Sequence, residues 1–158
     1  MGASDVDAVA DLYADILGAA YISFSELKEG KATAPGRLTD HAPAIFREQL
    51  VSHVSTARHG FYVALAGGEV VGFVLASLHQ ADAGHTECWI DDIGVRRAWR
   101  RRGVATALLE QACRWGTAEG AKYFLLESGV QNRSAHLLCE QLGFEPLSVV
   151  LWRAGSEE

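Results

Sequence analysis

The chain has 158 residues, of which 49% are hydrophobic and 22% charged, and its formal net charge is -6. This length allows one domain with a buried core but not two, so we expect a single domain over residues 1–158. No stretch approaches the roughly 20 apolar residues that cross a membrane, and the N-terminus lacks the layout of a signal peptide. Three cysteines without paired spacing fit a reducing compartment. We therefore expect a cytoplasmic protein with no membrane partner.

Helical patterns fill the first third of the chain. From Ser4 to Tyr21, apolar residues recur at helical spacing and predict an amphipathic helix. The stretch that begins at Ser23 is rich in small, polar and helix-breaking residues, which predicts a long surface connection that could lie over a substrate site. A second helix is predicted over residues 42–57, with Phe46 and Leu50 on its apolar side.

Strand patterns begin at Gly60. Two β-rich runs within residues 60–79 flank Gly67 and Gly68 and predict a hairpin, and residues 86–95 predict a third strand beside it. A helix is expected over 103–120, then a strand over 121–128 whose apolar run indicates that both faces are covered. A short helix over 132–144 and a last strand over 145–154 complete the chain. The fold class is α/β, with helices on both sides of a mixed, mostly antiparallel sheet, and no strand is predicted before the first helix.

Five of the 14 basic residues lie within residues 96–102, directly before Gly103 and a run of helix formers. A glycine turn that opens a helix points backbone N–H groups at one place, at the positive end of the helix dipole, which is typical of a phosphate-binding site. The rest of the chain holds nine basic and 20 acidic residues. Nucleic-acid partners favour a basic balance, so we predict one local anion site and no nucleic-acid partner.

Two motifs resemble the GNAT superfamily of acetyl-CoA-dependent N-acetyltransferases. Arg100, Gly103 and Ala105 match its Gln/Arg-x-x-Gly-x-Gly/Ala motif between a strand and a helix. The segment "NRSAHLLCEQLGF" is similar to a later family helix, with Asn132 and Gly143 among the matching positions. The resemblance implies the three-layer α/β/α GNAT fold, and the family strand that normally precedes the first helix is missing from the predicted order.

The resemblance also implies acetyl-CoA as the cofactor. Its pyrophosphate would lie on residues 100–106, and its pantetheine arm would pair like an extra strand with Ile93 and Val95. The residues so implied to bind the cofactor are Ile93, Gly94, Val95, Arg100, Arg101, Arg102, Gly103, Val104, Ala105, Thr106 and Asn132.

Four residues are candidates for the chemistry. A protonated amine must lose a proton before it attacks a thioester, and Asp91, Asp92 and Glu127 are the carboxylates that could take it. Strand alternation predicts that Asp91 and Asp92 point to opposite faces, so that at most one faces a given cleft. Cys139 stands where most family members have a tyrosine that protonates the departing thiolate.

The predicted function is transfer of an acetyl group from acetyl-CoA to a primary amine by direct attack, without a covalent acyl-enzyme. The acidic remainder of the chain favours a cationic acceptor, either a small molecule or a protein amine. The alternative is a non-catalytic acyl-CoA-binding or regulatory domain, and a polyanion binder is a third reading. No metal site is predicted, and a homodimer is left open.

Overall fold

The computed structural model describes residues 4–155. Its larger helices are α1 (Ser4–Ile16), α3 (Ala42–Val54), α4 (Val104–Ala118) and α5 (Arg133–Gln141). The strands of its main sheet are β3 (His59–Ala66), β4 (Glu69–Gln80), β5 (Thr86–Val95) and β6 (Ala121–Leu126). Smaller elements are the α-helix α2 (Phe24–Lys28), the strands β1 (Ala32–Ala34) and β2 (Arg37–Leu38), and short 3-10 turns at Ala19–Tyr21 and Arg97–Trp99.

The main sheet has the order β3-β4-β5-β6. The first three strands are antiparallel neighbours, whereas β6 runs parallel to β5 because α4 returns the chain along one face of the sheet. The β3–β4 hairpin turns at Gly67 and Gly68, whose φ angles of 59° and 87° explain why both positions are glycine. The predicted mixed, mostly antiparallel sheet is confirmed, and α1 is the first element of the described residues.

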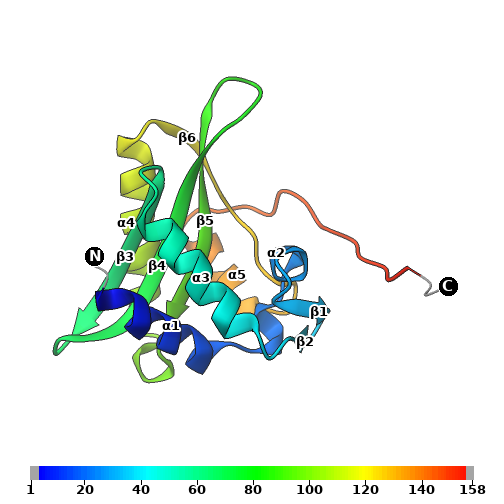
Figure 1. Cartoon of the computed structure of the whole chain (residues 1–158). Coiled ribbons are helices and arrows are strands. Elements are labelled where there is room, and N and C mark those ends of the chain that lie inside the picture. The colour runs from blue at the N-terminus through cyan, green and yellow to red at the C-terminus, as the bar shows by residue number, and fades with distance from the viewer. Residues whose placement is uncertain (1–3, 156–158) are drawn as a thin grey trace.

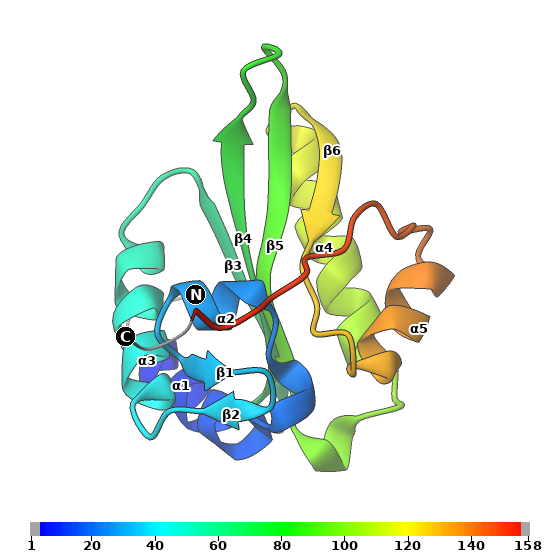
Figure 2. The same cartoon turned by 90° about the vertical axis from the view of Figure 1, so that its right-hand side faces the viewer.

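Two helical layers enclose the sheet, as Figures 1 and 2 show. On one face α1 and α3 pack through a stacked pair of rings, Tyr13 and Phe46, whose centroids are 3.8 Å apart. On the other face α4 packs Leu109 and Ala112 against the strands, with α5 beside it. The close approach of α4 needs Gly116, because a Cβ there would lie 2.8 Å from the Cys88 Sγ. The predicted α/β/α layering is therefore confirmed.

The long connection predicted from Ser23 is more ordered than expected. It contains α2 and the β1–β2 hairpin, which together lie beside the edge of the main sheet. Ser23 and Glu26 form a capping box, in which Ser23 caps α2 and the Glu26 carboxylate accepts a hydrogen bond from the Ser23 backbone N–H. The spacing Ser-x-x-Glu is a known helix-start pattern, so the sequence contained evidence for this helix.

The last strand predicted over 145–154 is wrong. This segment forms neither helix nor strand and extends away from the body of the molecule (Figure 1). A strand requires a neighbour to complete its hydrogen bonds, and none of the described residues pairs with this segment. The expectation that both faces of β6 are covered is also wrong, because Tyr123 is 48% exposed and Phe124 is only half-buried.

No helix within residues 4–155 is long and apolar enough to cross a membrane.

Candidate active site

The pairing of β5 changes halfway along the strand. Toward β4, β5 is paired over its whole length, from Thr86 to Val95. Toward β6, the pairing ends at Ile90, where β6 reaches Leu126 and the chain turns away. The segment from Asp91 to Val95 therefore has no strand on its β6 side among the described residues. This opening is the place where a ligand with amide groups could pair with Ile93 and Val95.

A glycine turn follows directly after β5. Arg101 and Gly103 both adopt the left-handed conformation, with φ angles of 62° and 79°, and α4 begins at Val104. No side chain caps the first turn of α4, so its backbone N–H groups stay available to a ligand. A Cβ built on Gly103 would meet no atom within 4 Å, which shows open space over the turn. This geometry fits a phosphate group, and Ala105 and Thr106 lie half-buried in the first helical turn.

The arginine cluster divides between two tasks. Arg96 is tied to the body of the protein, because its guanidinium donates to the Val70 carbonyl and to Asp15 at 2.9 Å each. Arg100 donates to the Val95 carbonyl at 3.2 Å, which fixes its stem beside the end of β5. The Arg102 guanidinium lies 5.0 Å from the centre of the Trp99 ring. Arg96 is thus a structural residue, while Arg100, Arg101 and Arg102 surround the turn with exposed positive charge.

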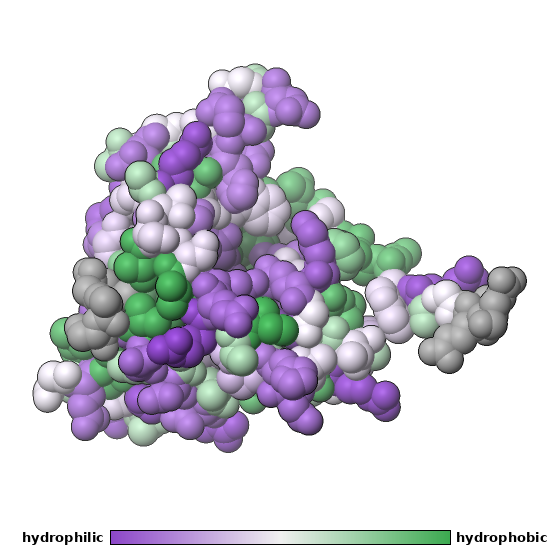
Figure 3. Space-filling view, viewed as in Figure 1, coloured by the Kyte–Doolittle hydropathy of each residue, from purple (hydrophilic) through white to green (hydrophobic). Residues whose placement is uncertain are grey.

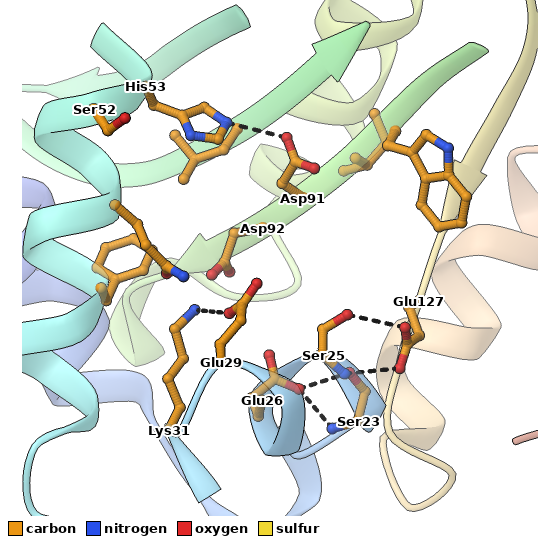
Figure 4. A pocket seen from close by; sticks show the side chains of 15 residues that line it. Ser23, Ser25, Glu26, Glu29, Lys31, Ser52, His53, Asp91, Asp92 and Glu127 are labelled. Atoms are coloured by element: carbon orange, nitrogen blue, oxygen red, sulfur yellow. Dashed lines mark hydrogen bonds and ion pairs between the residues drawn. The ribbon is translucent and has the colours of Figure 1, made fainter. Parts of the chain in front are cut away.

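A pocket of about 250 Å³ lies beside β5, between that strand, α2 and α3. Figure 4 shows the carboxyl groups of Glu29, Asp91, Asp92 and Glu127 around one central space. Its charged and titratable lining residues are Glu26, Glu29, Lys31, His53, Asp91, Asp92 and Glu127. Lys31 is only 4% exposed and its ammonium group lies 2.9 Å from Glu29. The remaining carboxyl groups face one histidine, so the pocket is acidic.

A β-bulge brings both neighbouring aspartates into this pocket. In the β4–β5 ladder Leu75 is opposite Asp92 and Ala76 is opposite Ile90, so Asp91 has no partner of its own. The extra residue breaks strand alternation, and both Asp91 and Asp92 line the pocket. The prediction that the two side chains point to opposite faces is therefore wrong.

Asp91 belongs to a hydrogen-bonded chain of polar side chains. One carboxylate oxygen lies 3.1 Å from His53 Nε2, and the other accepts a hydrogen bond of 2.9 Å from the Ser77 hydroxyl. Ser77 also lies 2.9 Å from Nε2 of the exposed His79. His53 stacks on His59 at 3.9 Å, and burial, followed by the neighbouring His53, lowers the pKa of His59. Asp91 therefore has one hydrogen-bonding partner inside the pocket, His53, and a second, Ser77, that connects it to His79 at the surface.

Asp92 is the contrasting carboxyl group. Its side chain is buried, and one of its oxygens has no hydrogen-bond partner among the described residues. Burial raises the pKa of Asp92 to about 8, although a backbone hydrogen bond at Ile93 acts in the opposite direction. Desolvation disfavours the charged form, so the Asp92 carboxyl group is mostly protonated at neutral pH when no cation is nearby.

The other predicted site residues have structural contacts. Glu127 accepts hydrogen bonds from the backbone N–H groups of Phe24 and Ser25 and from the Ser25 hydroxyl, at 2.6, 3.1 and 2.9 Å. Asn132 caps α5, and its side-chain oxygen lies 3.4 Å from the Ala135 N–H.

Gly94 and Cys139 both face packed regions. A Cβ on Gly94 would lie 2.5 Å from Phe73, so the glycine is explained by packing against the α1 side of the sheet. Cys139 is 9% exposed on α5 and does not line the pocket, and burial raises the pKa of its thiol.

Sequence reasoning missed several residues that line the pocket or contact Asp91. His53 lies on α3 and Ser77 on β4, far from Asp91 in the chain, and no local motif marks either of them. Glu26 and Glu29 lie in the segment that was predicted as a loop, where only the capping-box spacing gave a structural indication.

Comparisons with known proteins agree on one family. The model of the acetyltransferase (GNAT) family matches residues 22–144. The aminoglycoside N(6')-acetyltransferase type 1 of Salmonella typhimurium is 27% identical over 95 residues, which cover 58% of this chain and 66% of that protein. An N-alpha-acetyltransferase of Sulfurisphaera tokodaii is 29% identical over 150 residues, covering 82% of this chain and 90% of that protein. The fold matches the aminoglycoside N-acetyltransferase AAC(6')-Iy in complex with CoA, with a TM-score of 0.69, 21% identity and coverage of 98% and 91%.

Proposed function

The chain belongs to the acetyltransferase (GNAT) family, and we propose that it transfers an acetyl group from acetyl-CoA to a primary amine of a cationic acceptor. The observation that supports this proposal is the acidic pocket beside the unpaired part of β5. The same strand leads from this pocket to the glycine turn and the N-terminus of α4. A donor on the turn and an acceptor in the pocket would therefore meet at Asp91–Val95. We propose that residues 1–158 act as one domain.

The turn and the open edge of β5 would hold the cofactor. The N–H groups at the start of α4 and the exposed side chains of Arg101 and Arg102 would bind the pyrophosphate. Ile93 and Val95 would offer their backbone groups to the pantetheine amides, and an N–H near Val95 would stabilise the developing oxyanion. Acetyl-CoA supplies the acetyl group as a thioester, and the protein positions that group against the acceptor amine.

The charge of the pocket points to the class of acceptor. Glu26, Asp91, Asp92 and Glu127 share the pocket with Glu29, whose charge Lys31 balances. An acceptor with one amine would leave several carboxyl groups without a counter-charge. We therefore infer an acceptor with at least two positive charges, one on the reacting amine and one held deeper in the pocket. The named aminoglycoside acceptor of the Salmonella relative is consistent with this class.

Asp91 would accept the proton of the attacking amine. The amine nitrogen would form a bond to the acetyl carbon, the carbon–sulfur bond would break with CoA leaving as its thiolate, and the amine proton would move to the Asp91 carboxylate. Ser77 lies between Asp91 and His79 at 2.9 Å from each, so the proton can pass to the surface when His79 Nε2 is unprotonated. Asp92 suits this step less well, because a carboxyl group with a pKa of about 8 is mostly protonated at neutral pH.

The other three candidates would have different roles. Asp92 would bind the second positive charge, since a cation nearby favours the ionised form. Glu127 would hold α2 against the pocket through its three hydrogen bonds. Cys139 would remain a packing residue, because it does not line the pocket.

Turnover of acetyl-CoA with a panel of amines tests the proposal. The panel comprises spermidine, an aminoglycoside, a monoamine, a neutral amino acid and a peptide with a free N-terminus, and thiol release is followed with a disulfide reagent. We expect the polycationic amines to be acetylated with kcat/KM at least 100-fold above the neutral amino acid. Added salt should reduce this difference, because the attraction is electrostatic.

Two results would redirect the assignment. Preference for the peptide N-terminus would replace the polycationic acceptor with a protein amine. Tight CoA binding without turnover of any amine, in the panel or in a cell extract supplied with labelled acetyl-CoA, would favour the non-catalytic acyl-CoA-binding alternative.

A further inference from the structure

Lys31 places a buried ammonium group inside the pocket. The residue lies between α2 and β1, and its carbonyl accepts hydrogen bonds from the Thr39 backbone N–H at 2.8 Å and the Thr39 hydroxyl at 3.2 Å. A lysine usually extends its stem so that the ammonium group reaches water. The surface between α2 and α3 carries hydrophilic residues (purple in Figure 3), yet the Lys31 side chain is only 4% exposed and points into the pocket (Figure 4). The fold thus anchors the backbone of a lysine whose side chain turns inward.

The surroundings of this ammonium group have the composition of a cation site. Lys31 Nζ lies 2.9 Å from a carboxylate oxygen of Glu29, and 5.5 and 5.8 Å from the ring centres of Phe46 and Tyr13. An alkylammonium group within about 6 Å of an aromatic ring is attracted to the negative face of that ring. The two rings stack on each other and are almost fully buried, so they form a rigid wall. A carboxylate and an aromatic wall are groups that recognise an alkylammonium ion.

Two polar groups beside this site have no hydrogen-bond partner among the described residues. One is an oxygen of Asp92, which is 8% exposed and points into the same space (Figure 4), and the other is the buried Tyr13 hydroxyl. Burial, followed by the charges of Asp92, Glu26 and Glu29, raises the pKa of Tyr13, so the phenol stays neutral. Buried polar groups normally have partners, so this site has hydrogen-bonding capacity that Lys31 leaves unused.

We propose that the inner end of the pocket, formed by Tyr13, Glu29, Phe46 and Asp92, is an alkylammonium-binding site that the side chain of Lys31 occupies. The stem and ammonium group of a lysine are those of an n-alkylamine, so without Lys31 the site would take the aminoalkyl end of a polyamine. In the native chain the deeper charge of an acceptor reaches Asp92 and stops at Lys31, which makes Lys31 a specificity-determining residue. This effect on acceptor choice rests on the acetyl transfer proposed above, whereas the site itself does not.

Replacement of the side chain by a free amine tests the site. Lys31→Ala removes the three carbons and the nitrogen of n-propylamine. In about 100 mM n-propylammonium chloride the unfolding temperature of Lys31→Ala should rise by about 3 °C more than that of the wild type, because a ligand that binds only the folded state stabilises it. n-Propanol, which lacks the charge, and ammonium chloride, which lacks the stem, should give no such difference at the same concentration.

Two further variants control for lost charge and for lost packing. Lys28→Ala removes an exposed lysine of α2 that does not line the pocket, and Lys31→Met keeps the stem without the charge. Neither should respond to propylammonium more than the wild type does. A Lys31→Ala chain that is unfolded in buffer should fold when propylammonium is added, as followed by circular dichroism. No stabilisation specific to propylammonium, whether Lys31→Ala is folded or unfolded in buffer, would overturn the proposal.

Acceptor kinetics test the effect of Lys31 on specificity. Spermine carries one amine more than spermidine, and the emptied site of Lys31→Ala can hold it. The ratio of kcat/KM for spermine to that for spermidine should be about tenfold higher in Lys31→Ala than in the wild type, with CoA affinity unchanged. An unchanged ratio in a variant that binds propylammonium would contradict the role of Lys31 in acceptor choice. Loss of turnover with every amine in the wild type would contradict the proposed function, and propylammonium binding would still decide whether the site exists.

Discussion

The two ends of the chain contain similar apolar residues but bury them very differently. In α1, Val9, Leu12 and Tyr13 are fully buried against α3 and the sheet. In the C-terminal segment, Leu147 and Leu151 are 85% and 91% exposed. The difference lies in the neighbours, since α1 has a helix and a sheet to cover it and the C-terminal segment has neither. Hydrophobic pattern alone therefore predicts that a segment needs a partner, and only the structure shows whether the same chain supplies it.

The largest expected effect is on the free energy of unfolding, which should differ between a buried and an exposed apolar side chain. Phe46→Ala removes a ring that is 1% exposed and stacked on Tyr13, and we expect the free energy of unfolding to fall by about 3–5 kcal/mol. Leu137→Ala on α5, where the side chain is 55% exposed, is the comparison on the open side and should cost less than about 1 kcal/mol. Urea unfolding of both variants measures the difference. Equal losses would show that the α5 side is as tightly packed as the α1 side.

The next largest effect is expected on catalysis, at Asp91 of β5, the strand between the two regions. Asp91→Asn removes the proposed proton acceptor, and we expect kcat/KM to fall by about 10²–10⁴-fold while CoA affinity stays unchanged. Asp82→Asn, on the exposed turn between β4 and β5, is the matched control and should behave like the wild type. Steady-state kinetics from pH 6 to 9 provide the measurement. Wild-type rates for Asp91→Asn across this range would move the proton transfer to another group or to solvent.

The strand β5 also shows which features of the site could be predicted from the sequence. The bounds predicted for the third strand, residues 86–95, are those of β5, since a turn-like segment precedes it and the arginine-rich segment follows it. The bulge at Asp91 could not be predicted, since it depends on the register with β4 and not on any residue of β5 alone. His53 was missed for a similar reason, because only the packing of α3 brings it to Asp91.

The prediction of a strand in the C-terminal segment was wrong for a different physical reason. Its residues do favour a strand, but a strand forms only where an edge is available, and local preference cannot identify that edge. The glycine turn was easier to predict from the sequence, because the requirement for a left-handed residue at Gly103 is local.

The raised pKa of Asp92 should make the free energy of unfolding depend on pH. Its native pKa of about 8 lies above the value of about 3.9 expected in the unfolded chain. The native state therefore holds the proton more tightly, so this contribution to stability is fully present below about pH 4 and is lost as the pH rises toward 8. Between pH 5 and 7 we expect it to account for a loss of about 2–3 kcal/mol.

Asp92→Asn should remove this part of the pH dependence and make the variant more stable than the wild type above pH 8. Urea unfolding at several pH values compares the two proteins. Parallel stability curves would show that the Asp92 carboxyl group is not perturbed by burial.

A smaller effect is expected at the glycine turn. Gly103→Val places a branched side chain in the open space over the turn, and CoA affinity should fall at least tenfold, or by about 1.4 kcal/mol. The φ of 79° adds backbone strain, so Gly84→Val is the matched control, with a φ of 81° and equally open surroundings. Calorimetric titration with CoA should show the loss in the Gly103 variant alone. Equal affinities in two folded variants would contradict the cofactor assignment.

The smallest effect is expected at Cys139, on the open side of the molecule. The family tyrosine at this position would bring a phenol toward the thioester, whereas the Cys139 side chain is shorter, 9% exposed and absent from the lining of the pocket. Burial raises the pKa of its thiol, which disfavours the thiolate that a nucleophile would need. A CoA thiolate is also a good leaving group, since its thiol has a pKa near 8.5 and needs little protonation as it departs. We therefore expect Cys139→Ala and Cys139→Ser to keep kcat within about tenfold of the wild type, measured on an amine that the protein accepts. A loss of about a thousandfold in both variants, with CoA binding intact, would show that the thiol takes part in the chemistry and that direct attack without it is wrong.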